Sequence, residues 1–428
     1  MTGRHAVVAC AVAAAAGLSL AASPAPGGWP QWRGPNRDGV STETGLLQTW
    51  KAGGPAVAWR ATGLGTGFSS VAVAGGRIFT MGDSGGAQLL MALNGADGAR
   101  LWTTRVGPPW VDQMGGPRGT PTVDGDLVYA LGTEGDLVCV EAATGKERWR
   151  RSLPADFGGQ MMSMWKWSES PLVDGDRVVV TPGARAAGIV ALDKRTGRDV
   201  WRSSIPEIGA KGKDGAAYSS IVISNGGGVK QYVQLMGRGL VGVRASDGKY
   251  LWGYNRVAND VANIPTPIVR GDLVFTSSGY QTGAALLRLV PSAGGVEARE
   301  VYFLEPRTFQ NHHGGMVLVG DYVYAGHGHN KGFPIAIELQ TGKVAWGGDI
   351  RNAGTGSAAV AYADGELYFR YQNGEVILIE ATPAGYKEKG SLTIPGVSGP
   401  SWPLPVITGG RLYLREQDTL LAYDVRRG

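Results

Sequence analysis

Short apolar stretches alternate with tight polar turns along almost the whole chain. Each unit of this pattern opens with two stretches of β-branched or aromatic residues on either side of a dipeptide that contains glycine. Such dipeptides tolerate the positive φ angles of two-residue turns, and the flanking residues favour strands, so the pattern predicts a β-hairpin at the start of every unit. The turns are Gly75-Gly76, Asp124-Gly125, Asp174-Gly175, Gly271-Asp272, Gly320-Asp321, Asp364-Gly365, Gly409-Gly410 and, in the fourth unit, Asn225-Gly226.

A second half completes each unit with an apolar strand, a turn similar to Thr-Gly-Lys, and a strand that carries tryptophan. Residues 141–149 and 191–201 are clear copies. The last interval between tryptophans is twice the usual length of about 50 residues, which indicates a unit where Val301-Tyr302-Phe303 takes the place of tryptophan. Another copy without tryptophan turns at residues 380–385. The tryptophans of the pattern are Trp59, Trp102, Trp149, Trp201, Trp252 and Trp346.

The two ends of the chain each hold part of one unit. Trp59 lies in an apolar strand with no repeat before it, whereas the last copy stops at residues 422–425 without an outer strand. Joining the ends completes a unit and brings the count to eight. The sequence therefore predicts an all-β fold, an eight-bladed β-propeller of four-stranded antiparallel blades whose N-terminal strand closes the last blade. We expect each indole ring to fill the gap between blades, with the glycine of the preceding turn leaving room.

The propeller is expected to form one domain over residues 51–428, after an N-terminal extension over residues 23–50. The 69 glycines and 23 prolines among 428 residues suit its many turns. The net charge is +5, and the basic residues are scattered singly rather than gathered into a stripe. This distribution excludes a phosphate-binding surface, so nucleic acid is not an expected partner.

Residues 1–22 have the layout of a secretory signal peptide. Arg4 and His5 precede an apolar stretch that ends in small residues at Ala21 and Ala22. We expect an exported protein, periplasmic or secreted, with no transmembrane span in the mature chain and a monomeric state; retention of this segment as an anchor stays open. Its removal leaves Cys139 as a single, buried, structural thiol.

The Thr-Gly-Lys and tryptophan repeats resemble the tryptophan-docking motifs of the pyrroloquinoline-quinone (PQQ)-like propeller superfamily. The opening Trp29–Gly39 segment is similar to the start of bacterial exported PQQ-like repeat proteins, as are residues 168–175 and 311–315. This superfamily includes quinoprotein alcohol dehydrogenases and the lipoprotein propeller of the outer-membrane assembly machine. The resemblance implies the fold. The chain lacks the vicinal cysteine pair that quinoprotein dehydrogenases carry against the quinone, and it has no Cys-x-x-Cys-His haem site.

Residues just before each innermost strand should ring one mouth of the central channel. Aligning the units places Phe68, Arg118, Ser168, Tyr218, Ile264, His313 and Trp402 at equivalent positions. Glu169 and Asn263 are sequence neighbours of this set. Such mixed side chains around one opening suit a small polar ligand, although polar residues and water line any propeller mouth. The predicted ligand-binding residues are Arg118, Glu169, Tyr218, Asn263 and Trp402.

Four histidines fall within a short stretch around the Gly320-Asp321 turn. The hairpin register predicts His312 opposite His329 and Gly314 opposite His327. His312, His313, His327 and His329 are therefore a candidate site for Zn²⁺ or Cu²⁺, with Glu169 able to approach across the mouth. The alternative is a hydrogen-bonded polar end of one blade.

Three functions follow from these observations. The leading hypothesis is a non-catalytic scaffold that binds a protein partner or a small polar ligand at the mouth. The alternative is a quinoprotein alcohol dehydrogenase-like oxidoreductase, which uses PQQ with Ca²⁺ held by oxygens of residues such as Asn259 and Asn263. The third is a propeller that binds a transition metal at the histidine cluster. The chain has no nucleophile elbow, nucleotide-binding loop or His-Glu-x-x-His motif.

Overall fold

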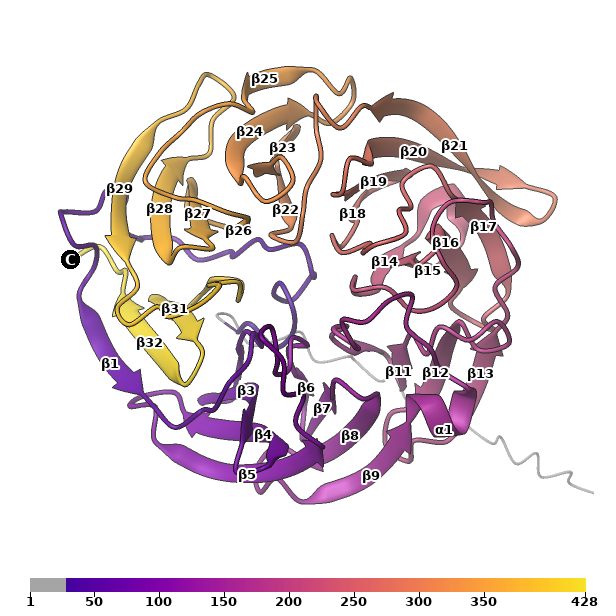
Figure 1. Cartoon of the computed structure of the whole chain (residues 1–428), viewed down its shortest axis with the longest axis horizontal. Helices are drawn as coiled ribbons and strands as arrows, with labels where there is room; N and C mark the ends of the chain where they lie inside the picture. The colour runs from indigo at the N-terminus through magenta and orange to yellow at the C-terminus, as the bar shows by residue number, and fades with distance from the viewer. Residues whose placement is uncertain (1–27) are drawn as a thin grey trace, which may run out of the picture.

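The computed structural model describes residues 28–428, and the predicted signal peptide lies outside them. In this part of the chain, eight four-stranded antiparallel sheets stand around a common axis (Figure 1). The innermost strand of each sheet faces the axis and the outermost lies at the rim. The predicted eight-bladed propeller is confirmed.

The strands of each blade follow one another from the axis to the rim. Blade 1 consists of β2 (Ala72–Ala74), β3 (Arg77–Ser84), β4 (Ala87–Asn94) and β5 (Arg100–Gly107), and blade 2 of β6 (Thr122–Asp124), β7 (Leu127–Leu131), β8 (Asp136–Glu141) and β9 (Glu147–Ser152). Blade 3 consists of β10 (Leu172–Asp174), β11 (Arg177–Val180), β12 (Ile189–Asp193) and β13 (Asp199–Ser203), and blade 4 of β14 (Val222–Ser224), β15 (Gln231–Met236), β16 (Gly239–Arg244) and β17 (Tyr250–Tyr254). Blade 5 consists of β18 (Ile268–Arg270), β19 (Leu273–Ser278), β20 (Gly283–Ser292) and β21 (Gly295–Leu304), and blade 6 of β22 (Met316–Val319), β23 (Tyr322–His327), β24 (Phe333–Glu338) and β25 (Val344–Gly347). Blade 7 consists of β26 (Ala358–Ala363), β27 (Glu366–Tyr371), β28 (Glu375–Glu380) and β29 (Glu388–Thr393), and blade 8 of β30 (Val406–Thr408), β31 (Arg411–Glu416), β32 (Thr419–Asp424) and β1 (Val57–Ala61). A short helix, α1 (Leu153–Phe157), and a 3₁₀ turn, η1 (Gly226–Gly228), lie in connections.

The ring closes as the sequence predicts, because β1 is the outer strand of the last blade. Trp59 pairs with Ala422 of β32, and Ala61 pairs with Leu420. No helix among the described residues is long and apolar enough to cross a membrane.

Seven of the eight predicted hairpin turns are two-residue turns at the predicted place or one residue from it. In the fourth unit the predicted turn at Asn225-Gly226 was wrong, because Ser224 pairs with Gln231 and residues 225–230 form a longer connection that includes η1. Asp124 pairs with Leu127 and Asp174 pairs with Arg177, so the turn residues there are Gly-Asp rather than Asp-Gly. Gly125 takes the first turn position with a φ of 59°, which suits a residue without a Cβ.

Four docked tryptophans, Trp102, Trp149, Trp201 and Trp346, donate an indole hydrogen bond to the blade that follows their own, whereas the Trp252 indole donates to Gln231 of its own blade at 2.6 Å. The Trp149 indole N–H donates to the Lys194 carbonyl at 3.0 Å, and the ring covers Gly197, where a Cβ would lie 2.7 Å from it. The expectation that the preceding turn leaves room was therefore wrong, since the glycine of the next blade does so. Tyr302 replaces tryptophan in blade 5 as predicted, and its hydroxyl donates to the Leu339 carbonyl at 2.7 Å.

Blade 7 has a glycine where a tryptophan is expected. Gly390 of β29 pairs with Leu378, as Trp346 of β25 pairs with Ala336. Trp50 from the N-terminal segment packs on this glycine, and its backbone N–H donates to the Lys389 carbonyl at 2.8 Å. A distant part of the chain thus supplies the missing aromatic ring.

Residues 28–50, predicted as an extension, run through the middle of the ring (Figure 1). Trp29 bridges to Val73 of blade 1, and the Pro30 carbonyl accepts from Val123 of blade 2. Val40 then bridges to Tyr362 of blade 7. Between these contacts, Arg37 donates to the Ser170 carbonyl at 2.7 Å, just before blade 3 and opposite blade 7, so the segment crosses the axis and closes one end of the channel.

Candidate functional site

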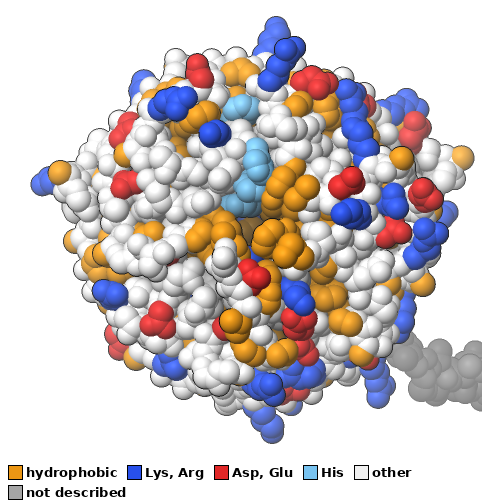
Figure 2. Space-filling view, viewed as in Figure 1, with side chains coloured by type: hydrophobic (Ala, Val, Ile, Leu, Met, Phe, Trp, Pro, Cys, Tyr) orange, Lys and Arg blue, Asp and Glu red, His pale blue; other side chains and the backbone are white. Residues whose placement is uncertain are grey.

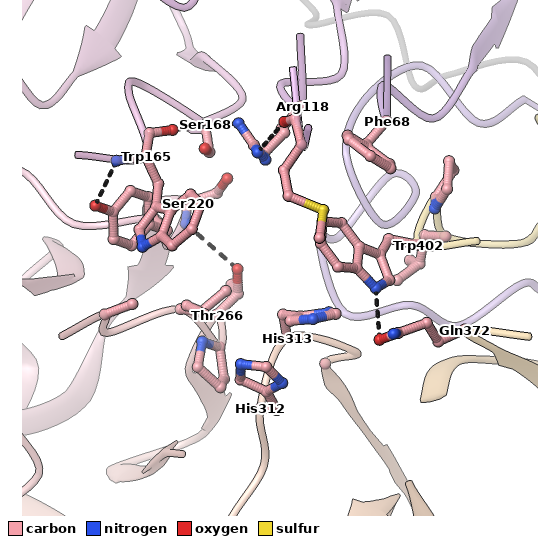
Figure 3. Close-up of a pocket in the computed structure, with 18 of the residues that line it drawn as sticks. Phe68, Arg118, Trp165, Ser168, Ser220, Thr266, His312, His313, Gln372 and Trp402 are labelled. Carbon is pink, nitrogen blue, oxygen red and sulfur yellow. Dashed lines mark hydrogen bonds between the residues drawn. The ribbon is translucent and has the colours of Figure 1, made fainter. Parts of the chain in front are cut away.

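The central channel holds a cavity of about 350 Å³ between the closing segment and the open mouth (Figure 3). Trp32 and Arg33 of the closing segment contribute to its wall, so the cavity has one blocked end. Most of its other lining residues come from the segments that precede the innermost strands, whereas Tyr280, His329 and Gln372 lie in loops between the second and third strands of their blades. The lining residues include Phe68, Met114, Arg118, Trp165, Ser168, Tyr218, Ser220, Ile264, Thr266, Tyr280, His312, His313, His329, Gln372 and Trp402.

The alignment of the repeats correctly predicted which residues lie at the mouth of the channel. All seven residues that it made equivalent line this cavity, including three of the five predicted ligand-binding residues: Arg118, Tyr218 and Trp402. They lie together because each blade enters its first strand at the same height, a few residues after the aligned position. Whether they bind a ligand stays a prediction.

The other two predicted binding residues, Glu169 and Asn263, lie behind the wall. The Glu169 carboxylate accepts from the Thr181 backbone N–H at 2.7 Å and from its hydroxyl at 3.0 Å. The Asn263 amide donates to the Gly237 carbonyl at 2.9 Å. These buried hydrogen bonds hold both side chains away from the cavity, although His312, one residue before the aligned His313, does line it. Burial raises the pKa of Glu169 to about 8.

Arg118 is held at the mouth by aromatic rings and carbonyls. Its guanidinium carbon lies 4.4 Å from the centre of the Trp110 ring and 5.5 Å from that of Phe68. One Nη donates to the Trp165 carbonyl at 3.2 Å, and the other donates to Met114. Burial lowers the pKa of Arg118 to about 10, so the group stays charged at neutral pH.

Arg33 is the cationic residue at the blocked end. It is 2% exposed, and its Nη2 donates to the carbonyls of Asp38, at 2.8 Å, and Met316. Within the described residues its Nε and Nη1 atoms have no hydrogen-bond partner. Burial lowers the pKa of Arg33 to about 10, which again leaves it charged at neutral pH.

Three of the four predicted histidines meet in the cavity. The ring centres of His312 and His313 lie 4.1 Å apart, and those of His312 and His329 lie 4.2 Å apart. The two ring nitrogens of His312 bond to the Ser357 hydroxyl at 2.8 Å and the Tyr280 hydroxyl at 3.1 Å. Burial, with a smaller effect of neighbouring charge, lowers the pKa of His313 to about 3, so this imidazole is neutral at pH 7.

His327 lies apart from the other three. The predicted register holds within the hairpin, where Met316 pairs with Ala325, but β22 starts at that residue. Gly314 instead accepts a hydrogen bond from Val360 of the next blade, so it does not face His327. The His327 ring packs beside Phe309. Within residues 28–428, no group of three or more His, Cys, Asp or Glu side chains is arranged to hold a metal ion.

Several cavity residues were not predicted from the sequence. Trp32 and Arg33 belong to the Trp29–Gly39 segment, which was noted only as a family resemblance. Tyr280 lies in the loop between β19 and β20, on no aligned position. Its ring centre is 4.3 Å from that of His329, so it forms one wall of the histidine cluster.

A comparison with protein families matches most of this chain to one of them. The model described as outer membrane protein assembly factor BamB covers residues 36–130 and 86–348. This chain belongs to that PQQ-like, BamB-type propeller family.

Curated relatives align with only part of the BamB-type propeller. The outer membrane protein assembly factor BamB of Alkalilimnicola ehrlichii is 30% identical over 140 residues, which is 32% of this chain and 32% of that protein. The quinohemoprotein alcohol dehydrogenase ADH IIB of Pseudomonas putida is 25% identical over 209 residues, or 44% of this chain and 27% of that enzyme. The chain thus spans about a third or less of the length of these relatives.

Solved structures share the fold at low identity. BamB from Moraxella catarrhalis superposes with a TM-score of 0.60 at 15% identity, covering 84% of this chain and 95% of that one. Quinohemoprotein alcohol dehydrogenase from Comamonas testosteroni superposes with a TM-score of 0.64 at 14% identity, covering 94% and 81%. At this identity the likeness concerns the fold alone.

Proposed function

We propose that this BamB-type propeller is an exported, non-catalytic binding protein that takes a small polar ligand in its central cavity. The observation that carries the proposal is a blocked cavity of about 350 Å³ that is lined by aromatic rings, hydroxyls and guanidinium groups. This size and mixture suit a small molecule that is held by ring contacts and oriented by a few polar groups.

The chemistry of the wall favours binding over catalysis. No Asp or Glu is among the described residues that line the cavity. The imidazoles of His312 and His313 have pKa values lowered to about 2 and 3, first by burial, so they are weak bases at neutral pH. Proton abstraction by a side chain is most effective when its pKa lies near the working pH, and neither ring meets that condition.

The residues do not fit the quinone–calcium pair of the oxidoreductase alternative. Ca²⁺ prefers several carboxylate or carbonyl oxygens. The Asn263 side-chain oxygen already accepts from the Asn259 amide at 2.9 Å and from the Ser278 hydroxyl at 3.1 Å. With no carboxylate on the described wall, we derive no step through PQQ.

A second candidate, an assembly scaffold, is favoured by apolar side chains on the loops around the mouth. Met164 is 66% exposed and directly precedes the cavity-lining Trp165, and Val111, which is 90% exposed, follows Trp110, whose ring contacts the cavity-lining Arg118. Figure 2 shows histidine side chains at the centre of this face with hydrophobic side chains around them. Exposed apolar groups gathered on one face suit a protein partner.

The test is a thermal-shift panel on the protein purified after export. The panel contains neutral, anionic and cationic small molecules, both aromatic and aliphatic, and binding is confirmed by quenching of tryptophan fluorescence. We expect at least one class to raise the melting temperature with saturation, because a ligand that binds only the folded state stabilises it. No response to any class would contradict the ligand-binding proposal.

A parallel assay addresses catalysis. The protein is mixed with PQQ and Ca²⁺, and dye-linked alcohol oxidation is measured. We expect no turnover above the buffer control. Sustained turnover would replace the binding proposal with the oxidoreductase alternative.

Export is tested by fractionation of the native host or of a Gram-negative expression strain. We expect the protein outside the cytoplasm and shortened by the predicted signal peptide, residues 1–22. A full-length cytoplasmic product would contradict this part of the proposal.

A further inference from the structure

We infer that the ligand of the central cavity is a small organic anion, with its charged group near Arg118 and a flat apolar body against the rings of Phe68 and Trp402. The inference rests on the proposed binding function and names the chemical class of its ligand. It follows from the balance of charge and of hydrogen-bond donors around the cavity.

The interior of the ring carries positive charge without a paired acid. Arg33 and Arg118 line the cavity, and Arg37 lies buried behind it with its Nη2 donating to the Ser170 carbonyl at 2.7 Å. None of the three forms an ion pair with a carboxylate in residues 28–428, and their hydrogen bonds go to carbonyls or, for Arg37, also to the Gln31 amide oxygen. Carbonyls orient a guanidinium group but do not neutralise it, so the wall keeps its charge.

The nearest acids lie outside the cavity wall. Glu169 influences Arg37, but burial raises its pKa to about 8 and keeps it largely protonated at neutral pH. Asp112 and Asp38 act on Arg118 and Arg33 through space, and neither lines the cavity. Cations in a site shielded from water gain strongly from an anion placed among them.

Hydroxyl groups on the opposite wall have protons free to donate. The Ser220 oxygen accepts from the Ser170 backbone N–H at 3.0 Å, and the Thr266 oxygen accepts from the Ser220 N–H at 3.3 Å and the Trp32 indole at 3.4 Å. Because these oxygens serve as acceptors, their O–H protons remain for the cavity. Figure 3 shows Ser220 and Thr266 facing the same open space as Arg118.

Gln372 adds a further donor. Its side-chain oxygen accepts from the Trp402 indole N–H at 3.0 Å, which turns the amide nitrogen away from that contact and leaves it a donor. The described wall therefore offers donors and full positive charges, and it has no full negative charge. A carboxylate, which only accepts hydrogen bonds, satisfies such a wall better than a neutral or cationic group.

The apolar part of the ligand is expected beside a run of rings. Phe68 and Trp402 have ring centres 4.7 Å apart, and Trp402 meets His313 edge-on at 4.6 Å. These rings lie across the cavity from Ser168 and Ser220 (Figure 3). A flat body fits between such a wall and the donors.

The experiment compares 2-naphthoate with 2-naphthamide, which has the same ring and no charge. Binding to the exported, purified protein is measured by calorimetry. We expect 2-naphthoate to bind at least tenfold more tightly. Equal or tighter binding of the amide, or no binding of 2-naphthoate, overturns the inference. If a neutral compound of the panel binds while 2-naphthoate does not, the proposed binding function survives and the anion inference alone fails.

Variants locate the anion within the cavity. Arg118→Gln is expected to reduce the preference for 2-naphthoate to less than about twofold, whereas Arg118→Lys keeps most of it because the charge remains. Arg195→Gln is the control, since that side chain is 65% exposed on the outside of the ring. A folded Arg118→Gln protein that keeps the tenfold preference overturns the inference. The comparison of the two probes on the unchanged protein stays decisive if a variant fails to fold.

Discussion

Trp50 lies on Gly390, a position in the outer strand of blade 7 that corresponds to the docked tryptophan of other blades. A Cβ on Gly390 would lie 2.7 Å from the Trp50 Cβ, so the glycine makes the close approach possible. The ring centre of Trp50 is 5.7 Å from that of Tyr368, inside the core between blades 7 and 8. A residue that precedes the propeller repeats thus completes the packing of blade 7, which lies near the C-terminal end of the chain.

Replacing Trp50 by alanine is expected to destabilise the protein by about 3 kcal/mol or more, because a large buried ring leaves a cavity behind. Trp50→Phe should recover a good part of the loss. Both are measured by thermal and urea unfolding. A Trp50→Ala protein as stable as the unchanged chain would show that the ring contributes little to closing the propeller.

Alanine at Gly197 should cost more than alanine at Gly175. Both glycines have positive φ, 69° and 59°, so the backbone cost is similar. Only Gly197 sits under a tryptophan, with its added Cβ 2.7 Å from the Trp149 ring, whereas nothing lies within 4 Å of a Cβ on Gly175. We expect an extra loss of about 1–3 kcal/mol for Gly197→Ala in urea unfolding. Equal losses would mean that the docked ring is free to shift.

Stability is expected to depend on pH through Glu169. Burial raises its pKa from 4.5 to about 8 in the folded state. Between these values the unfolded chain has lost the proton and the folded protein keeps it, so this group lowers stability as pH rises, by up to about 1.4 kcal/mol per pH unit. Above about pH 8 its effect levels off.

Glu169→Gln tests this dependence, because glutamine resembles the protonated acid. The variant should gain stability relative to the unchanged protein between pH 5 and pH 8, measured by urea unfolding at several pH values. The Thr181 N–H and hydroxyl bond to different oxygens of Glu169, so in the variant the amide oxygen accepts from the N–H and the amide nitrogen faces the hydroxyl oxygen, which can accept. A difference that does not change with pH would show that Glu169 is ionised in the folded protein.

Metal content tests the histidine prediction. His312 has both ring nitrogens in hydrogen bonds, and His327 lies apart, so we expect little metal in the purified protein. Elemental analysis of the unchanged protein and of His312→Ala should give equal, substoichiometric values. One equivalent of Zn²⁺ or Cu²⁺ that is lost in the variant would establish the site.

The fold was predictable because its repeats carry local signals. The glycine-containing turns identified the hairpins in the sequence. The position of Tyr302 followed from the spacing of the tryptophans alone. The same spacing located Arg118 and Trp402 in the cavity, since equivalent positions of a propeller blade lie at equivalent heights. Glu169 and Asn263 were misplaced because each bonds to a buried partner behind the wall, the Thr181 groups and the Gly237 carbonyl, and the spacing of the repeats does not specify such partners.

The remaining features depend on contacts that no repeat encodes. His327 lies apart from the other three histidines because Gly314, predicted to lie opposite it, bonds to the neighbouring blade rather than to its own hairpin. Arg33 and Trp50 belong to a segment outside the repeats, and nothing in its pattern specifies which blades it touches. Their positions follow from long-range packing, which a single sequence does not display.

The crossing segment also constrains the order of assembly. Residues 29–50 leave the ribosome before any blade, yet Tyr362, Lys389 and Arg426, which they contact, are made with the final blades. The crossing segment can therefore form these contacts only after those blades have been synthesised. The blocked cavity comes into existence only when synthesis of the ring is nearly finished, so an incomplete product has no formed pocket in which to retain a ligand.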